Sequence, residues 1–208
     1  MNLTESILVI ISVLLIMLAL NQIVGVFPSV IGSLLRKKEC FNLEDSVKLA
    51  RARDNSAAVL FLPFTLIAAH YGVYEPRWQV EMPVNTRIWL DLAVFFAFFL
   101  IRLGMYFIVF PKKGDYKNYK LAYKAGYSYF IFLTALLLVL VGVMSFMGMN
   151  PEVVKSAIYW VTAAVYLLLL VRKMQFFVTS AGFLTGFLYL CTLEFIPTGL
   201  LVVSAILF

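Results

Sequence analysis

The stretch SILVIISVLLIMLALNQIVGVFPSVIGSLL, residues 6–35, contains no charged side chain. A helix needs about 20 mostly apolar residues to cross the hydrocarbon core of a bilayer, so this run is longer than one crossing requires. Gly25 and Pro28 lie in its second half and predict a kink or a break there. The stretch therefore predicts a membrane-spanning helix near the start of the chain.

The composition of the whole chain agrees with a membrane protein. Of the 208 residues, 63% are hydrophobic and 13% are charged, whereas soluble domains average about 45–50% and about 25%. A soluble fold of this size has too much surface to hide so many apolar side chains. These values exclude disorder, a collagen repeat, a disulfide scaffold and nucleic acid as a partner. We attribute the net charge of +6 to cytoplasmic loops that face anionic membrane lipids.

The apolar runs predict a single all-α membrane domain over residues 1–208. This domain is a bundle of six transmembrane helices. The predicted spans are residues 6–35, 56–74, 86–110, 127–149, 151–171 and 183–208. Basic residues cluster after the first, third and fifth spans: Arg36, Lys37, Lys38, Lys48, Arg51, Arg53, Lys112, Lys113, Lys117, Lys120, Lys124, Arg172 and Lys173. The positive-inside rule places these loops in the cytoplasm and both termini on the opposite side.

The loop after the third span carries two stripes of side chains at helical spacing. The stripes consist of Lys113, Lys117, Lys120 and Lys124, and of Tyr116, Tyr119, Tyr123 and Tyr127. On a helix these spacings give adjacent cationic and aromatic faces. Together with Arg51 and Arg53, they are candidates for binding anionic lipid headgroups or a partner protein. Ordinary anchoring at the membrane surface explains the same pattern.

Two ionisable residues predict a contact inside the bundle. A charged side chain deep in a bilayer costs at least about 2.5–3.5 kcal/mol, so each one needs a reason. At about 1.5 Å of rise per residue, Arg102 lies roughly 12 Å and Glu194 roughly 16 Å above the cytoplasmic ends of their spans. We therefore expect a buried ion pair, which serves as a structural clasp or as a binding site. Pro197 follows Glu194 closely and predicts a kink that opens a polar niche.

His70 and Asp91 form a second candidate pair, near the outer ends of the second and third spans. Each lies roughly 6–7 Å below the predicted outer end. A contact between them would provide a general base or a proton-linked site, but the same positions fit a single interfacial hydrogen bond or no contact. The sequence shows no metal-binding motif and no cofactor-binding motif.

The run FLYLCTLEFIP, residues 187–197, resembles the closing signature of the DUF4271 family of multi-pass proteins from Bacteroidota. The loop that ends in RARDN, residues 51–55, and the lead-in Arg172, Lys173 and Met174 are similar to it as well. The resemblance implies a protein of the inner membrane in a bacterium with two membranes. It includes Glu194 and Pro197 in the motif and implies no catalytic role.

Three functions fit these observations. The first is a non-catalytic scaffold, assembly factor or partner subunit of a cell-envelope complex. The second is a small transporter or lipid flippase with Arg102 and Glu194 as its site. The third is an enzyme that modifies lipids in the outer leaflet with His70 and Asp91.

Overall fold

The computed structural model describes residues 3–76, 82, 84–108 and 116–207, and helices make up most of these ranges. The helices are α1 (Leu3–Leu35), α2 (Lys37–Asp45), α3 (Val47–His70), α4 (Val84–Ile108), α5 (Tyr116–Phe146), α6 (Pro151–Ala181), α7 (Phe183–Leu190) and α8 (Ile196–Leu207). A π-helical turn, Cys191–Phe195, joins α7 to α8. No strand occurs in these ranges, so the all-α prediction is confirmed for them.

Five segments are long and apolar enough to cross a membrane. They are Thr4–Leu35, Thr86–Ile108, Asn118–Phe146, Pro151–Thr179 and Phe183–Ala205. These segments give a multi-pass membrane protein. The predicted second span, residues 56–74, is not among them, because α3 ends at His70 and its uncharged part begins only at Ser56. That part is shorter than the about 20 residues that a crossing needs.

Two helices extend ten residues or more beyond their predicted ends. The helix predicted over residues 127–149 begins at Tyr116, so the lysine and tyrosine stripes continue into its first turns. The helix predicted over residues 151–171 continues to Ala181. Arg172 and Lys173 therefore belong to α6 and not to a loop, and both are buried. Charged residues can continue a helix where partners within the protein neutralise them, which a composition window does not detect.

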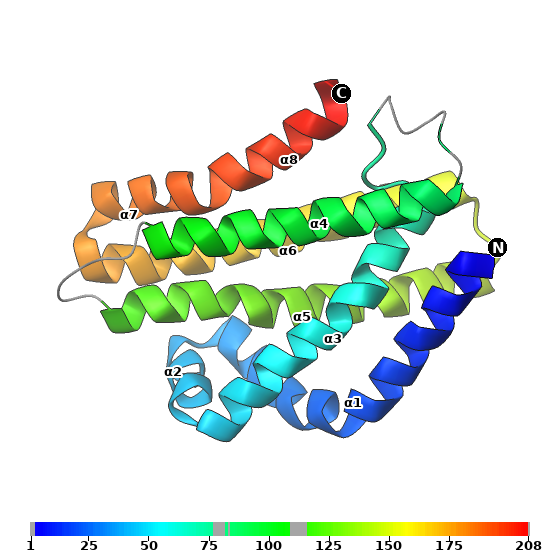
Figure 1. The fold of residues 1–208 in the computed structure, drawn as a ribbon. Helices are drawn as coiled ribbons and strands as arrows, with labels where there is room; N and C mark the ends of the chain where they lie inside the picture. The colour runs from blue at the N-terminus through cyan, green and yellow to red at the C-terminus, as the bar shows by residue number, and fades with distance from the viewer. Residues whose placement is uncertain (1–2, 77–81, 83, 109–115, 208) are drawn as a thin grey trace.

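α4, α5 and α6 lie along a common direction, whereas α1 and α3 run obliquely to it (Figure 1). α5 packs along α6, α7 packs on α6, and α4 packs on the π-helical turn and on α8. α1 and α3 pack against each other and against α5, while α2 lies at the end of the bundle where α4 ends and α5 begins. α1 remains one helix through Pro28, although it bends visibly before its C-terminal end.

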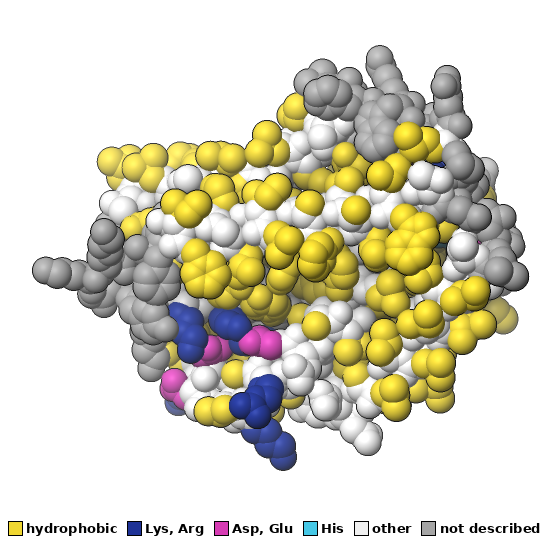
Figure 2. Space-filling model, in the orientation of Figure 1, with side chains coloured by type: hydrophobic (Ala, Val, Ile, Leu, Met, Phe, Trp, Pro, Cys, Tyr) yellow, Lys and Arg dark blue, Asp and Glu magenta, His cyan; other side chains and the backbone are white. Residues whose placement is uncertain are grey.

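The surface of the bundle is mostly apolar. Leu18 is 83% exposed, and large apolar side chains are exposed on every one of the five candidate spans. Figure 2 shows hydrophobic side chains over most of one face, with charged side chains gathered near α2. Such a surface fits a bilayer as solvent and not water.

The turn from α6 to α7 depends on a close backbone approach. Gly182 ends α6 with a positive φ of 84°, and its N–H donates to the carbonyl of Val178. Four residues later, a Cβ on Gly186 would lie 3.1 Å from the backbone carbon of Phe177. Backbone atoms cannot yield as a flexible side chain can, so α7 packs this closely on α6 only because residue 186 is glycine.

We expect the substitution Gly186→Ala to lower the free energy of unfolding by about 1–3 kcal/mol, because it overpacks this contact. Thermal unfolding of the purified protein in detergent measures the change. Gly199→Ala on α8 is the matched control, since a Cβ there would meet nothing within 4 Å. Equal stability losses in the two variants would contradict the close approach.

A candidate functional site at Glu194

A carboxylate in the last candidate span lies at the centre of a buried polar cluster. Glu194 belongs to the π-helical turn and is 1% exposed. Arg102 and Tyr106 reach it from α4, where four residues place them on the same helix face. Lys173 reaches it from α6 and is 0% exposed. The cluster therefore joins three elements that are distant in the sequence.

The two carboxylate oxygens of Glu194 are both occupied. Nη2 of Arg102 donates to Oε1 at 2.9 Å and to Oε2 at 2.7 Å. The Tyr106 hydroxyl donates to Oε1 at 3.0 Å. The ammonium group of Lys173 contacts Oε1 as well, and it donates to the Tyr106 hydroxyl at 2.6 Å. Charge-assisted hydrogen bonds of this kind are strong in a medium of low dielectric constant.

The backbone around Glu194 is shaped for this cluster. In the π-helical turn, the N–H of Ile196 bonds the carbonyl of Cys191, five residues earlier. Pro197 follows and has no N–H to donate. The Tyr166 hydroxyl lies 3.3 Å from the Glu194 carbonyl and 3.0 Å from Oγ1 of Thr198, so it adds a side-chain donor near the irregular turn. Single π-helical turns are frequent at functional sites of helices.

Neighbouring residues hold the other members of the cluster. The Tyr119 hydroxyl on α5 donates to the backbone carbonyl of Tyr106 at 3.0 Å. Gly126, also on α5, leaves room for the basic groups: a Cβ there would lie 3.4 Å from Nη2 of Arg102 and 3.8 Å from Nζ of Lys173. α5 thus completes the enclosure of the cluster.

The sequence predicted a contact between Arg102 and Glu194, and the structure has it. Lys173 and Tyr106 also belong to the cluster, although the sequence patterns do not predict it. The sequence predicts a cytoplasmic loop at Lys173, because this residue follows Arg172 at the end of an apolar run. Tyr106 follows Arg102 by four residues, so both lie on the same helix face. This spacing was the only sequence pattern that could have predicted Tyr106 in the cluster.

Within the described residues, the structure does not bring His70 and Asp91 into contact, which is one of the alternatives that the sequence leaves open. Nδ1 of His70 lies 2.6 Å from Oε1 of Glu5 on α1, and the His70 side chain is 54% exposed. Asp91 is 0% exposed, so it lies inside the bundle. Their similar depth follows from helix rise, but the face of the helix on which each residue lies depends on packing.

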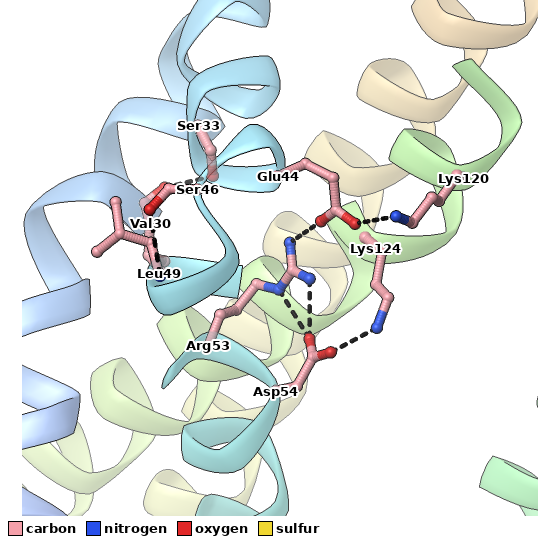
Figure 3. A network of polar contacts seen from close by, with 9 residues as sticks. All are labelled: Val30, Ser33, Glu44, Ser46, Leu49, Arg53, Asp54, Lys120 and Lys124. Carbon is pink, nitrogen blue, oxygen red and sulfur yellow. Dashed lines mark hydrogen bonds and ion pairs between the residues drawn. The ribbon is translucent and has the colours of Figure 1, made fainter. Parts of the chain in front are cut away.

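A second polar network ties α2 and α3 to α5 (Figure 3). The Arg53 guanidinium lies 3.0 Å from a carboxylate oxygen of Glu44 and 2.8 Å from one of Asp54. Lys120 pairs with Glu44 at 2.9 Å, and Lys124 pairs with Asp54 at 2.5 Å. Arg53 is 2% exposed, so the prediction that it binds lipid headgroups is wrong. Its charge is neutralised within the protein.

The tyrosine stripe points into the bundle as well. Tyr119 is buried, so it does not lie among lipid headgroups as predicted. Tyr123 is half-buried, and its hydroxyl lies 2.6 Å from that of Tyr127. Lys113 and the side chains of Tyr116 and Lys117 lie outside the described residues. Arg51 is exposed, and a lipid contact there stays a prediction.

Two further features bear on chemistry. Cys40 on α2 is buried, and burial raises the pKa of its thiol, which lowers its reactivity. In the part of the chain that the structure describes, no group of three or more His, Cys, Asp or Glu side chains could hold a metal ion.

A family model described as a domain of unknown function, DUF4271, matches residues 6–204. The chain belongs to the DUF4271 family. The DUF4271 match spans all members of the Glu194 cluster, as well as Arg53 and its partners. No curated protein and no solved structure matches the chain.

Proposed function

We propose that this DUF4271 protein is a non-catalytic membrane subunit that binds a partner protein of the cell envelope through α1. The observation that carries this proposal is the exposure of Asn21 and Gln22 within the apolar run of α1. Neither amide makes a side-chain hydrogen bond within the described ranges. An amide in a hydrocarbon environment gains from a hydrogen bond to another helix, worth about 0.6–2 kcal/mol each.

The position of α1 supports this role. α1 packs on its neighbours α2, α3 and α5, and its outer face exposes apolar side chains that include Met17, Leu18 and Val24. Leu15, Gln22 and Asn55 are among the residues that line a groove between α1 and α3. A partner helix with its own hydrogen-bonding side chain would satisfy these amides and bury the apolar rim.

The closed geometry of the Glu194 cluster favours a subunit over a transporter. A transport site must be reached by its substrate, whereas Glu194 is 1% exposed and both its oxygens are occupied. The contact of His70 with Glu5 argues against the pairing of His70 with Asp91 that the lipid-modifying enzyme requires. We therefore propose a structural role for the cluster, as a clasp between α4, α6 and the last span.

We further propose that α3 crosses the membrane as a sixth span and that both termini face away from the cytoplasm of a bacterial inner membrane. α3 supports this, since it runs obliquely from the end near α2 towards the opposite end of the bundle (Figure 1). Its charged first half, residues 47–55, is neutralised in part by the Arg53 network. Alkaline phosphatase fused to either terminus should be active outside the inner membrane, and activity at one terminus only would exclude six crossings.

The double variant Asn21→Leu, Gln22→Leu tests the partner proposal. We expect the wild-type protein to purify from native membranes with one envelope protein at a fixed stoichiometry. The amount of this partner that purifies with the double variant should be at least tenfold lower. The variant keeps α1 apolar, so its thermal unfolding should match that of the wild type. Leu18→Ala, on the same face, is the control that removes apolar surface but no amide.

Two outcomes would overturn the proposal. One is a wild-type protein that purifies from native membranes alone as a monomer. The other is a double variant that retains its partner in full.

A further inference from the structure

A charged cavity lies at the end of the bundle where α3 and α5 end and α4 and α6 begin. Its volume is about 490 Å³, within the range of small-molecule sites. The side chains and backbone that line it include Tyr71, Gly72, Glu75, Arg87, Glu152 and Lys155. Candidate spans begin at Thr86 and Pro151 and end at Phe146, so the cavity lies at a membrane boundary.

Two cations in the cavity share one carboxylate. Arg87 and Lys155 both contact Glu75, the latter with Nζ 3.4 Å from Oε2. Nε of Arg87 is buried and has no hydrogen-bond partner within the described ranges. A buried donor without a partner costs about 1–3 kcal/mol, so a shift of the partly exposed Arg87 side chain towards an acceptor in the cavity would be stabilising.

Gly72 keeps the space beside the ion pair open. Its φ of 58° lies in the left-handed region that favours glycine. A Cβ at this position would lie 2.7 Å from Oε2 of Glu75 and 3.1 Å from Nη2 of Arg87. The turn after α3 therefore depends on glycine for its conformation and for the placement of the two charged groups.

A second carboxylate balances the charge of the cavity. Glu152 lies in the first turn of α6, is exposed, and makes no ion pair within the described ranges. The cavity thus offers two cations and the start of a long helix, which favour an anion, together with two carboxylates, which favour a cation. A zwitterion satisfies both requirements, whereas a purely anionic group would meet the two carboxylates.

We propose that this cavity binds the phosphoethanolamine headgroup of a membrane lipid. The phosphate accepts from Arg87 and Lys155, and the ammonium group donates to Glu152. The exposed apolar side chain of Met149, which lines the cavity, receives the glycerol and the first methylene groups. The position at the ends of three candidate spans favours a lipid over a soluble phosphate ester.

Native mass spectrometry of the detergent-purified full chain tests this assignment. We titrate phosphatidylethanolamine and phosphatidylglycerol with identical acyl chains, and O-phosphoethanolamine as the headgroup alone. We expect phosphatidylethanolamine to bind at least tenfold more tightly than either alternative. Equal binding of the free headgroup would identify a soluble ligand instead and would overturn the assignment to a lipid.

Variants separate the two halves of the headgroup. Arg87→Gln should weaken phosphatidylethanolamine binding at least tenfold, whereas Arg36→Gln, at an exposed arginine between α1 and α2 and outside the cavity, should not change it. Glu152→Gln should abolish the preference over phosphatidylglycerol while phosphatidylglycerol still binds.

Lys155→Gln provides a second test if Arg87→Gln does not fold, as judged by circular dichroism. Wild-type binding in both folded variants, or no lipid preference in the wild-type protein, would overturn the proposal.

Discussion

The substitution Glu194→Gln is expected to lower the free energy of unfolding by about 3–5 kcal/mol. The amide removes the negative charge but keeps the size of the side chain. Arg102, which is partly exposed, and Lys173, which is 0% exposed, would then lack a counter-charge. The loss of one partner of a buried ion pair is costly, because the remaining charge keeps its desolvation penalty.

Unfolding of the purified protein by titration with a denaturing detergent measures this loss. Glu152→Gln is the matched control, because it makes the same chemical change on an exposed side chain at the start of α6. We expect its stability to change by no more than about 0.5 kcal/mol. If the Glu194→Gln variant unfolds at the same detergent concentration as the wild-type protein, the proposed structural role of the Glu194 cluster is wrong.

A neutral combination gives a second readout on the same cluster. Arg102→Leu, Lys173→Met and Glu194→Leu together leave no unpaired charge, and buried ion pairs can often be replaced by apolar groups without loss. We expect this triple variant to be more stable than Glu194→Gln alone. If it is less stable, the cluster contributes more than neutralisation, and the hydrogen bonds of Glu194 and Lys173 to the Tyr106 hydroxyl become the candidates.

The substitution Arg53→Gln is expected to lower the free energy of unfolding by about 2–3 kcal/mol. Arg53 is 2% exposed and bridges Glu44 on α2 to Asp54 on α3. The expected loss is below that for Glu194, because Lys120 and Lys124 still neutralise the two carboxylates. Asp54 is also partly exposed, which screens its charge.

Arg51→Gln is the control for Arg53→Gln, since Arg51 lies two residues earlier on α3 and is exposed. Lys120→Gln should cost less than about 1 kcal/mol, because its side chain is 43% exposed. If Arg51→Gln and Arg53→Gln destabilise the protein equally, the buried network does not hold α2 against α3 and α5.

The depth of a residue in the membrane could be read from the sequence, but its direction around the helix could not. Depth depends on one distance, the helix rise, so Arg102 and Glu194 were placed at similar heights and do meet. The same reasoning gave His70 and Asp91 a similar depth, yet His70 contacts Glu5 on α1. The packing of α1 against α3 decides this contact, and no residue pattern within α3 encodes it.

The sequence by itself determined that the solvent of this protein is a lipid bilayer. An uncharged apolar helix that is longer than the thickness of the bilayer is stable in few environments other than a membrane. It also determined that the charges of Arg102 and Glu194 need partners. Only the tertiary structure decided which partners they have. Lys173 and Tyr106 join the cluster because α6 and α4 flank the π-helical turn, and Arg53 is buried because α2 covers it with Glu44. Such contacts depend on how helices are rotated and paired, and that follows from packing over the whole bundle.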